Sequence, residues 1–136
     1  MGSLAPLATA PLLVQLHVAF GLAALAAGTA RVGWPWPQQR DRLFGWAFLA
    51  LLAATAATAV FLAVPPGTPN LLGVTLGHAF VAVTGIGLVA AVRTARRPNG
   101  LVWRNIVTAL FAGVLLTCGL FELMPGRLMN TVLAGG

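Results

Sequence analysis

Residues 43–64 read LFGWAFLALLAATAATAVFLAV, and this stretch decides the fold. It carries no charged residue, and about 20 apolar residues suffice to cross the hydrocarbon core of a bilayer, which is about 30 Å thick. The run also lacks the regular alternation of apolar and polar residues that a lipid-facing barrel strand shows. It therefore predicts a transmembrane helix.

Three further runs of the same kind flank it, at about Leu12–Ala30, Leu71–Val92 and Leu101–Met124. Of the 136 residues, 59% are hydrophobic and only 7% are charged, whereas soluble domains carry about 25% charged residues. Short connections make successive helices antiparallel neighbours. We therefore expect an all-α integral membrane protein, an up-and-down four-helix bundle that forms a single transmembrane domain over residues 1–136.

The two halves of the chain resemble each other, at about residues 11–67 and 71–126. LHVAFGLAALAAG at 16–28 and GHAFVAVTGIGLV at 77–89 are each followed by basic residues and then by an apolar run that ends in Pro-Gly. This pattern predicts two tandem helical hairpins. His17 and His78, the only histidines, hold matching places in them and should face each other across a pseudo-two-fold axis.

The basic residues predict the orientation. Seven of the eight arginines flank the first and third connections, and the second connection has none. By the positive-inside rule both termini should lie on the non-cytoplasmic side of a bacterial inner membrane. The net charge of +6 then reflects topology and lipid headgroups, and it does not indicate nucleic-acid binding. Trp34, Trp36, Trp46 and Trp103 should anchor the interface with their N–H groups in contact with water.

Three ionisable side chains should converge near the outer surface. With helix starts near residues 11 and 71, a rise of 1.5 Å per residue places His17 and His78 at equal depth, roughly 9–11 Å below that surface. Glu122 should point toward the same level from the fourth helix. Two imidazoles and a carboxylate suit zinc, copper or iron, while two imidazoles alone suit haem b. Gly21 and Gly85 would leave room for the porphyrin, and Phe20 could stack at its edge.

Structural roles are the alternative for these residues. In this alternative, each histidine does no more than form a hydrogen bond with a neighbouring helix. Glu122 extends outward to the membrane surface beside Arg127. Gln15 and Thr75 are weaker candidates for partners that fix the imidazole tautomers. Ala19, Ala23, Ala26 and Ala30 line one face of the first helix, and such small residues can pack the bundle itself or another subunit.

The chain resembles a family of small four-helix bacterial membrane proteins of unknown function. The positions that carry the resemblance are His17, Gly21, the Arg40–Arg42 turn with Gly45, His78 and Glu122. Family members often have further histidines near the places that Asp41 and Trp103 hold here. The resemblance thus supports the four-helix architecture. Because this chain lacks the further histidines, a second site on the cytoplasmic side is in doubt.

Three functions follow as hypotheses. The first is a redox or electron-transfer protein that holds haem b or a transition metal through His17 and His78. The second is a non-enzymatic accessory or assembly subunit of a larger membrane complex, or a homodimer. Proton handling ranks last, because the inner half of every span lacks a polar relay. No nucleophile–base pair, phosphate loop or carboxylate pair is present, so the sequence leaves open whether the chain is an enzyme.

Overall fold

The computed structural model describes residues 5–62, 70–71, 74–96, 100–122 and 132. Its elements, in chain order, are α1 (Ala5–Ala8), α2 (Leu12–Gly33), α3 (Gln38–Val60), β1 (Asn70–Leu71), β2 (Val74–Thr75), α4 (Leu76–Ala95), α5 (Gly100–Leu110), the π-helix η1 (Phe111–Leu116) and α6 (Thr117–Glu122). Four helical segments are long and apolar enough to cross a membrane: Leu12–Gly33, Gln38–Val60, Gly77–Ala95 and Gly100–Leu120. The prediction of an all-α architecture with four candidate membrane spans is confirmed.

Prolines set the boundary between the first two spans. Helix α2 ends at Gly33, and Trp34 adopts an extended conformation with φ −134° and ψ 136°. Trp34 precedes Pro35, whose ring disfavours a helical conformation at the residue before it. Pro37, with φ −54°, then caps α3. Two Trp-Pro pairs thus produce the tight connection of the first hairpin.

The third and fourth spans differ from the expectation. Helix α4 begins at Leu76 instead of Leu71, because β1 and β2 pair as a short antiparallel ladder, Asn70 with Thr75 and Leu71 with Val74. The fourth span is a helix in three parts, since the six residues of η1 separate α5 from α6. Neither the ladder nor the π-helix has a signal in the apolar pattern.

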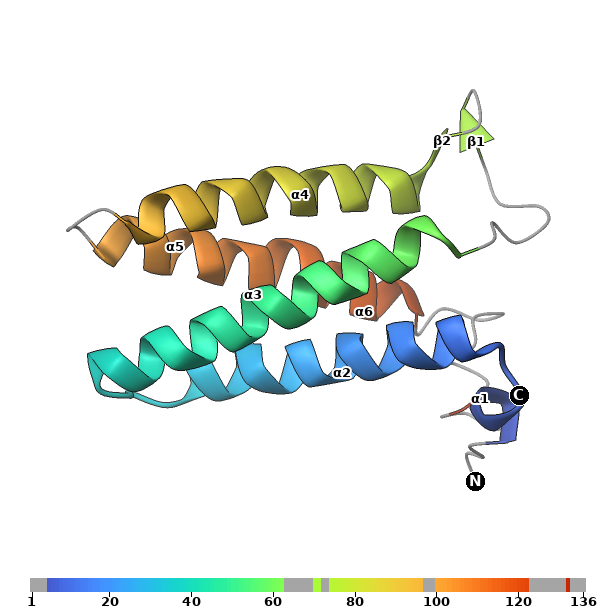
Figure 1. Ribbon diagram of the computed structural model, residues 1–136, viewed down its shortest axis with the longest axis horizontal. Coiled ribbons are helices and arrows are strands. Elements are labelled where there is room, and N and C mark those ends of the chain that lie inside the picture. Colours follow the sequence, from blue (N-terminus) through green and yellow to red (C-terminus); the bar gives the residue numbers. More distant parts are fainter. Residues whose placement is uncertain (1–4, 63–69, 72–73, 97–99, 123–131, 133–136) are drawn as a thin grey trace.

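The helices pack as two hairpins, α2 with α3 and α4 with α5, and α3 also packs on α4 while α2 packs on η1. Helices α2 and α4 are therefore diagonal in the bundle. Figure 1 shows that the α2–α3 and α4–α5 connections share one end. We call this the basic end, after Arg31, Arg40, Arg42, Arg93, Arg96 and Arg104. The opposite end, where α2 and α4 begin, is the histidine end.

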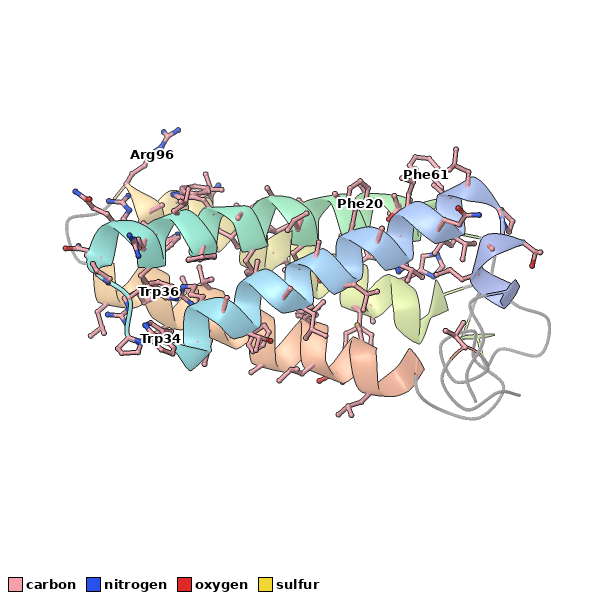
Figure 2. The ribbon with its side chains drawn as sticks, turned by 90° about the horizontal axis from the view of Figure 1, so that it is seen from below. Phe20, Trp34, Trp36, Phe61 and Arg96 are labelled. Carbon is pink, nitrogen blue, oxygen red and sulfur yellow. The ribbon has the colours of Figure 1, made fainter. Side chains whose placement is uncertain are left out.

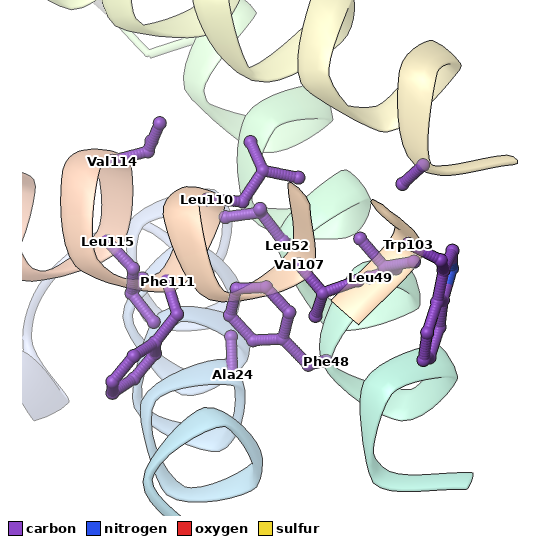
Figure 3. Packing of buried hydrophobic residues seen from close by; sticks show 11 residues of the cluster. Ala24, Phe48, Leu49, Leu52, Trp103, Val107, Leu110, Phe111, Val114 and Leu115 are labelled. Atoms are coloured by element: carbon purple, nitrogen blue, oxygen red, sulfur yellow. The ribbon is translucent and has the colours of Figure 1, made fainter. Parts of the chain in front are cut away.

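The buried core lies in the half of the bundle near the basic end. Figure 3 shows Phe48 and Leu52 of α3 packed against Val107 and Leu110 of α5. Phe48 also meets Phe111 edge-on, with ring centroids 6.0 Å apart. The spacing of three or four residues between Trp103, Val107, Leu110 and Val114 places these side chains on one face of the helix. The fourth span packs on the other helices through this face.

The outward faces are apolar, as expected for helices in lipid. Phe61 and Ile86 are 76% and 72% exposed, and Figure 2 shows Phe61 at the opposite end of the molecule from Arg96. On α2 the buried residues are Ala24, Gly28 and Arg31. In the alanine stripe of α2, Ala30 is half-buried, whereas Ala19, Ala23 and Ala26 are exposed. These three alanines therefore do not pack the bundle itself.

Candidate functional site

His17 lies in the second turn of α2 and is half-buried against α3. Its Nδ1 is 3.0 Å from the carbonyl oxygen of Thr55 and 2.9 Å from Oγ1 of Thr58. The partners that hold the ring thus come from the neighbouring helix. Gln15, the partner expected from the sequence, instead donates through Nε2 to Ala10 O at 2.8 Å and to Ala8 O at 3.2 Å.

These contacts determine the tautomer of His17. The Thr55 carbonyl can only accept, so a ring nitrogen 3.0 Å from it must carry the hydrogen. The Thr58 hydroxyl donates within its own helix, with Ala54 O at 3.0 Å and Thr55 O at 2.9 Å. When that hydroxyl hydrogen is used within the helix, a lone pair of Thr58 Oγ1 can share the Nδ1 hydrogen with the Thr55 carbonyl, as a three-centre bond. In the neutral imidazole the lone pair then lies on Nε2, which is the form that coordinates a metal ion.

His78 lies in the first turn of α4 and is exposed. It shares the histidine end with His17, and the two come from diagonal helices. The sequence expectation of equal depth assumed equal distances from the helix starts. His17 follows the start of α2 by five residues, whereas His78 follows the start of α4 by two. The two distances therefore differ, because the β-ladder occupies residues before Leu76 and α4 begins only there.

The two glycines expected beside a porphyrin have different surroundings. A Cβ on Gly21 would lie 3.8 Å from Cγ2 of Thr55, so this glycine faces α3. A Cβ on Gly85 would have no described atom within 4 Å, so this side of α4 is open. The open side lies on the helix that carries His78.

The third expected ligand is Glu122, the last residue of α6. Its backbone belongs to the described part of the chain, but its side chain lies outside it, as does the side chain of Thr75. Within the described residues no group of three His, Cys, Asp or Glu side chains could hold a metal ion. The trio of His17, His78 and Glu122 therefore stays a prediction.

The histidine end is packed differently from the basic end. No described residue is buried in residues 12–23 of α2, 53–60 of α3, 77–83 of α4 or 116–120 of the fourth span. Phe80 and Cys118, which lie in these stretches, are partly buried and pack against the core cluster. The fully buried side chains of the four spans therefore lie nearer the basic end.

A second polar cluster, missed from the sequence, lies at the basic end. Arg31 and Asp41 are 5% and 7% exposed, and their Nε and Oδ1 atoms form an ion pair at 3.2 Å. This contact lacks the alignment of a hydrogen bond, whereas a second guanidinium nitrogen donates to Oδ2 at 3.5 Å. Arg104 approaches the same Oδ2 through its Nε, also at 3.5 Å. Asp41 thus lies between two arginines.

Two features of the sequence could have pointed to this cluster. Asp41 is one of only two acidic residues in the chain, and Arg31 falls within a membrane span. A charged group in a span is costly unless it is paired. The basic turn by itself indicates only topology, and the pairing of Arg31 with Asp41 depends on the packing of the hairpin.

Trp103 corrects the expectation that all four tryptophans anchor the interface. Trp34 is 65% exposed and Trp46 is 40% exposed, which fits that role. Trp36 departs from it in part, because its Nε1 donates to Ala30 O at 2.8 Å. Trp103 is only 3% exposed, and its Nε1 has no hydrogen-bond partner in the described structure. Its ring lies against Gly45 and under the Arg31 guanidinium, 5.5 Å from the ring centroid. Trp103 therefore belongs to the core and supports the charged cluster.

Comparison of the chain with protein-family models, with curated proteins and with solved structures gave no significant match. The resemblance drawn from the sequence therefore identifies no family.

Proposed function

We propose that this chain is a multi-pass membrane protein that binds a transition metal ion or haem b at its histidine end and serves a redox or electron-transfer role. The observation that carries the proposal is the Nδ1 contact of His17 with the Thr55 carbonyl, at 3.0 Å. Metal-binding histidines almost always donate their other ring N–H to a carbonyl, carboxylate or water, which fixes both tautomer and ring orientation. His17 has this arrangement.

His78 is the second proposed ligand, and Glu122 the third for a metal ion. Imidazole and carboxylate suit zinc, copper or iron; iron or copper would supply one-electron chemistry. For haem, two histidines would be the axial ligands, and the open side of α4 at Gly85 is where a porphyrin would have room. Gly21 packs on α3, so it leaves no room for a porphyrin there. This favours a metal ion over haem, because a metal ion requires only its ligands.

Substitution of the histidines tests the proposal. The chain purified from membranes should contain a stoichiometric metal ion or haem, and His17→Ala or His78→Ala should lose it, because each removes a ligand. Elemental analysis and absorption spectra of matched samples provide the measurement. Gln15→Ala is the control, since Gln15 bonds the carbonyl groups of Ala8 and Ala10. Equal metal and haem content in all four proteins would overturn the proposal.

Thr58 gives a sharper test of the tautomer argument. Thr58→Val removes the hydroxyl 2.9 Å from Nδ1 at nearly constant volume. We expect the affinity for the bound group to fall about 10- to 100-fold, as for other groups that orient a ligand. Metal or haem titration of the apo-protein would measure this. Thr94→Val is the matched control, because Thr94 also bonds its own helix, at Ala90 O; an equal loss there would contradict the assigned role.

The second candidate function is that of an accessory or assembly subunit. The specific observation in its favour is the exposed stripe of Ala19, Ala23 and Ala26 on α2, which permits close approach of another helix. A metal-free, haem-free chain that purifies with a partner, and keeps it after both histidine substitutions, would favour this function over the first.

A further inference from the structure

A pocket at the basic end has polar and apolar walls. It has a volume of about 520 Å³ and lies between the end of α2, the following Trp34-Pro35 segment and one face of α5. Leu101, Arg104, Asn105 and Thr108 share that face of α5, at the spacing of successive helical turns. Arg31 and Asp41 complete the lining. The volume falls within the range of about 300–1,000 Å³ that small-molecule sites occupy.

The pocket carries an excess positive charge. Arg31 and Arg104 share the single carboxylate of Asp41. Arg31 is fixed on its other side, where it donates to Thr108 Oγ1 at 3.2 Å. Arg104 faces Asp41 with Nε, its side chain is 62% exposed, and its terminal nitrogens meet no acceptor within the described part of the chain. A guanidinium held in this way can donate two parallel hydrogen bonds to a phosphate.

The rim of the pocket is apolar and open. Val32, Trp34 and Leu101 are 52%, 65% and 62% exposed. They lie at the ends of membrane spans, in the region where tryptophan marks the headgroup level of a bilayer. A ligand that occupies both walls must combine an anionic group with a hydrocarbon chain.

We propose that this pocket binds the phosphate headgroup of an anionic phospholipid, with Arg104 as the residue that contacts the phosphate. Asp41 holds both arginines in place, and the exposed rim receives the first part of the acyl chain. Basic pockets between spans are known binding places for anionic headgroups. A free phosphate ion has the same polar chemistry but leaves the apolar rim unused, so the lipid fits the pocket better.

Tryptophan quenching tests this inference on the full chain. The protein is placed in vesicles of phosphatidylcholine and phosphatidylglycerol. In one sample the phosphatidylglycerol is brominated near its headgroup, and in the other the phosphatidylcholine is. Trp34 lines the pocket, so bound brominated lipid should quench it. We expect phosphatidylglycerol to bind about fivefold more strongly than phosphatidylcholine. Measurement at about 0.3 M salt reduces long-range attraction, because the Debye length is then well under 10 Å.

Two variants separate the pocket from surface charge. Arg104→Gln should reduce the preference about fivefold, to near unity. Arg96→Gln removes the same charge from an exposed residue at the same end that does not line the pocket, so its preference should remain. The inference is overturned if wild type shows no preference, or if both variants lose it equally. Displacement of the brominated lipid by inorganic phosphate alone would assign the pocket to the free ion instead.

Discussion

Asp41→Asn is expected to lower the free energy of unfolding by about 3 kcal/mol, near the lower end of the 3–5 kcal/mol range for breaking a buried ion pair. The substitution keeps the shape of the side chain but removes its charge. Arg31, only 5% exposed, would then retain an uncompensated positive charge within a membrane span. Thermal or denaturant unfolding in detergent micelles measures the effect.

Two comparisons test the cause of this loss. Arg104→Gln removes the second ion pair of the cluster, between Asp41 and an arginine side chain that is 62% exposed. It should lower the free energy of unfolding by less than about 1 kcal/mol. Replacing both buried partners, Arg31→Met with Asp41→Leu, should recover most of the stability, because no charge is left unpaired. If the double variant is as unstable as Asp41→Asn, charge pairing is not the reason for the loss.

The second large effect is expected for Gly45→Val. A Cβ at Gly45 would collide with Cη2 of Trp103, and the ring is confined by burial and by the Arg31 guanidinium above it. Overfilling a packed core commonly costs 1–3 kcal/mol, and we expect about 2 kcal/mol here. Displacement of Trp103 should also change the tryptophan fluorescence spectrum. Both readouts come from one unfolding series.

Gly119→Val is the matched control for this substitution. It introduces the same β-branched side chain into a helix, but no described atom lies within 4 Å of its Cβ position. Its unfolding free energy should stay within about 0.5 kcal/mol of wild type, as for other surface substitutions. A comparable loss at both glycines would indicate a general cost of valine in these helices, and the close contact with Trp103 would not be its cause.

The architecture could be predicted because bilayer thickness imposes a simple rule on length and composition. Any uniformly apolar run of about 20 residues satisfies it. The second span, Gln38–Val60, overlaps most of the run at 43–64 but begins five residues before it. The histidine end was also predictable, since alternate helices in an up-and-down bundle begin at the same end. His17 and His78 share that end for this reason, because each lies near the start of its helix, α2 or α4.

The details of both ends depended on contacts that a linear pattern does not contain. The partners of His17, Thr55 and Thr58, are about 40 residues away along the chain and become neighbours only through hairpin packing. The ladder before α4 moves His78 into the first helical turn. In the sequence Asp41 is part of a basic turn, whereas in the structure it is buried between two arginines at the centre of a cluster.

The most direct test of the proposed function is an absorption spectrum of the wild-type chain, oxidised and then reduced with dithionite, with elemental analysis of the same sample. We predict either a Soret band that shifts on reduction, or a flat spectrum with stoichiometric zinc, copper or iron. The first result would assign haem to the histidine end, and the second would assign a metal ion. A colourless sample without metal would contradict the proposal that His17 and His78 bind a cofactor.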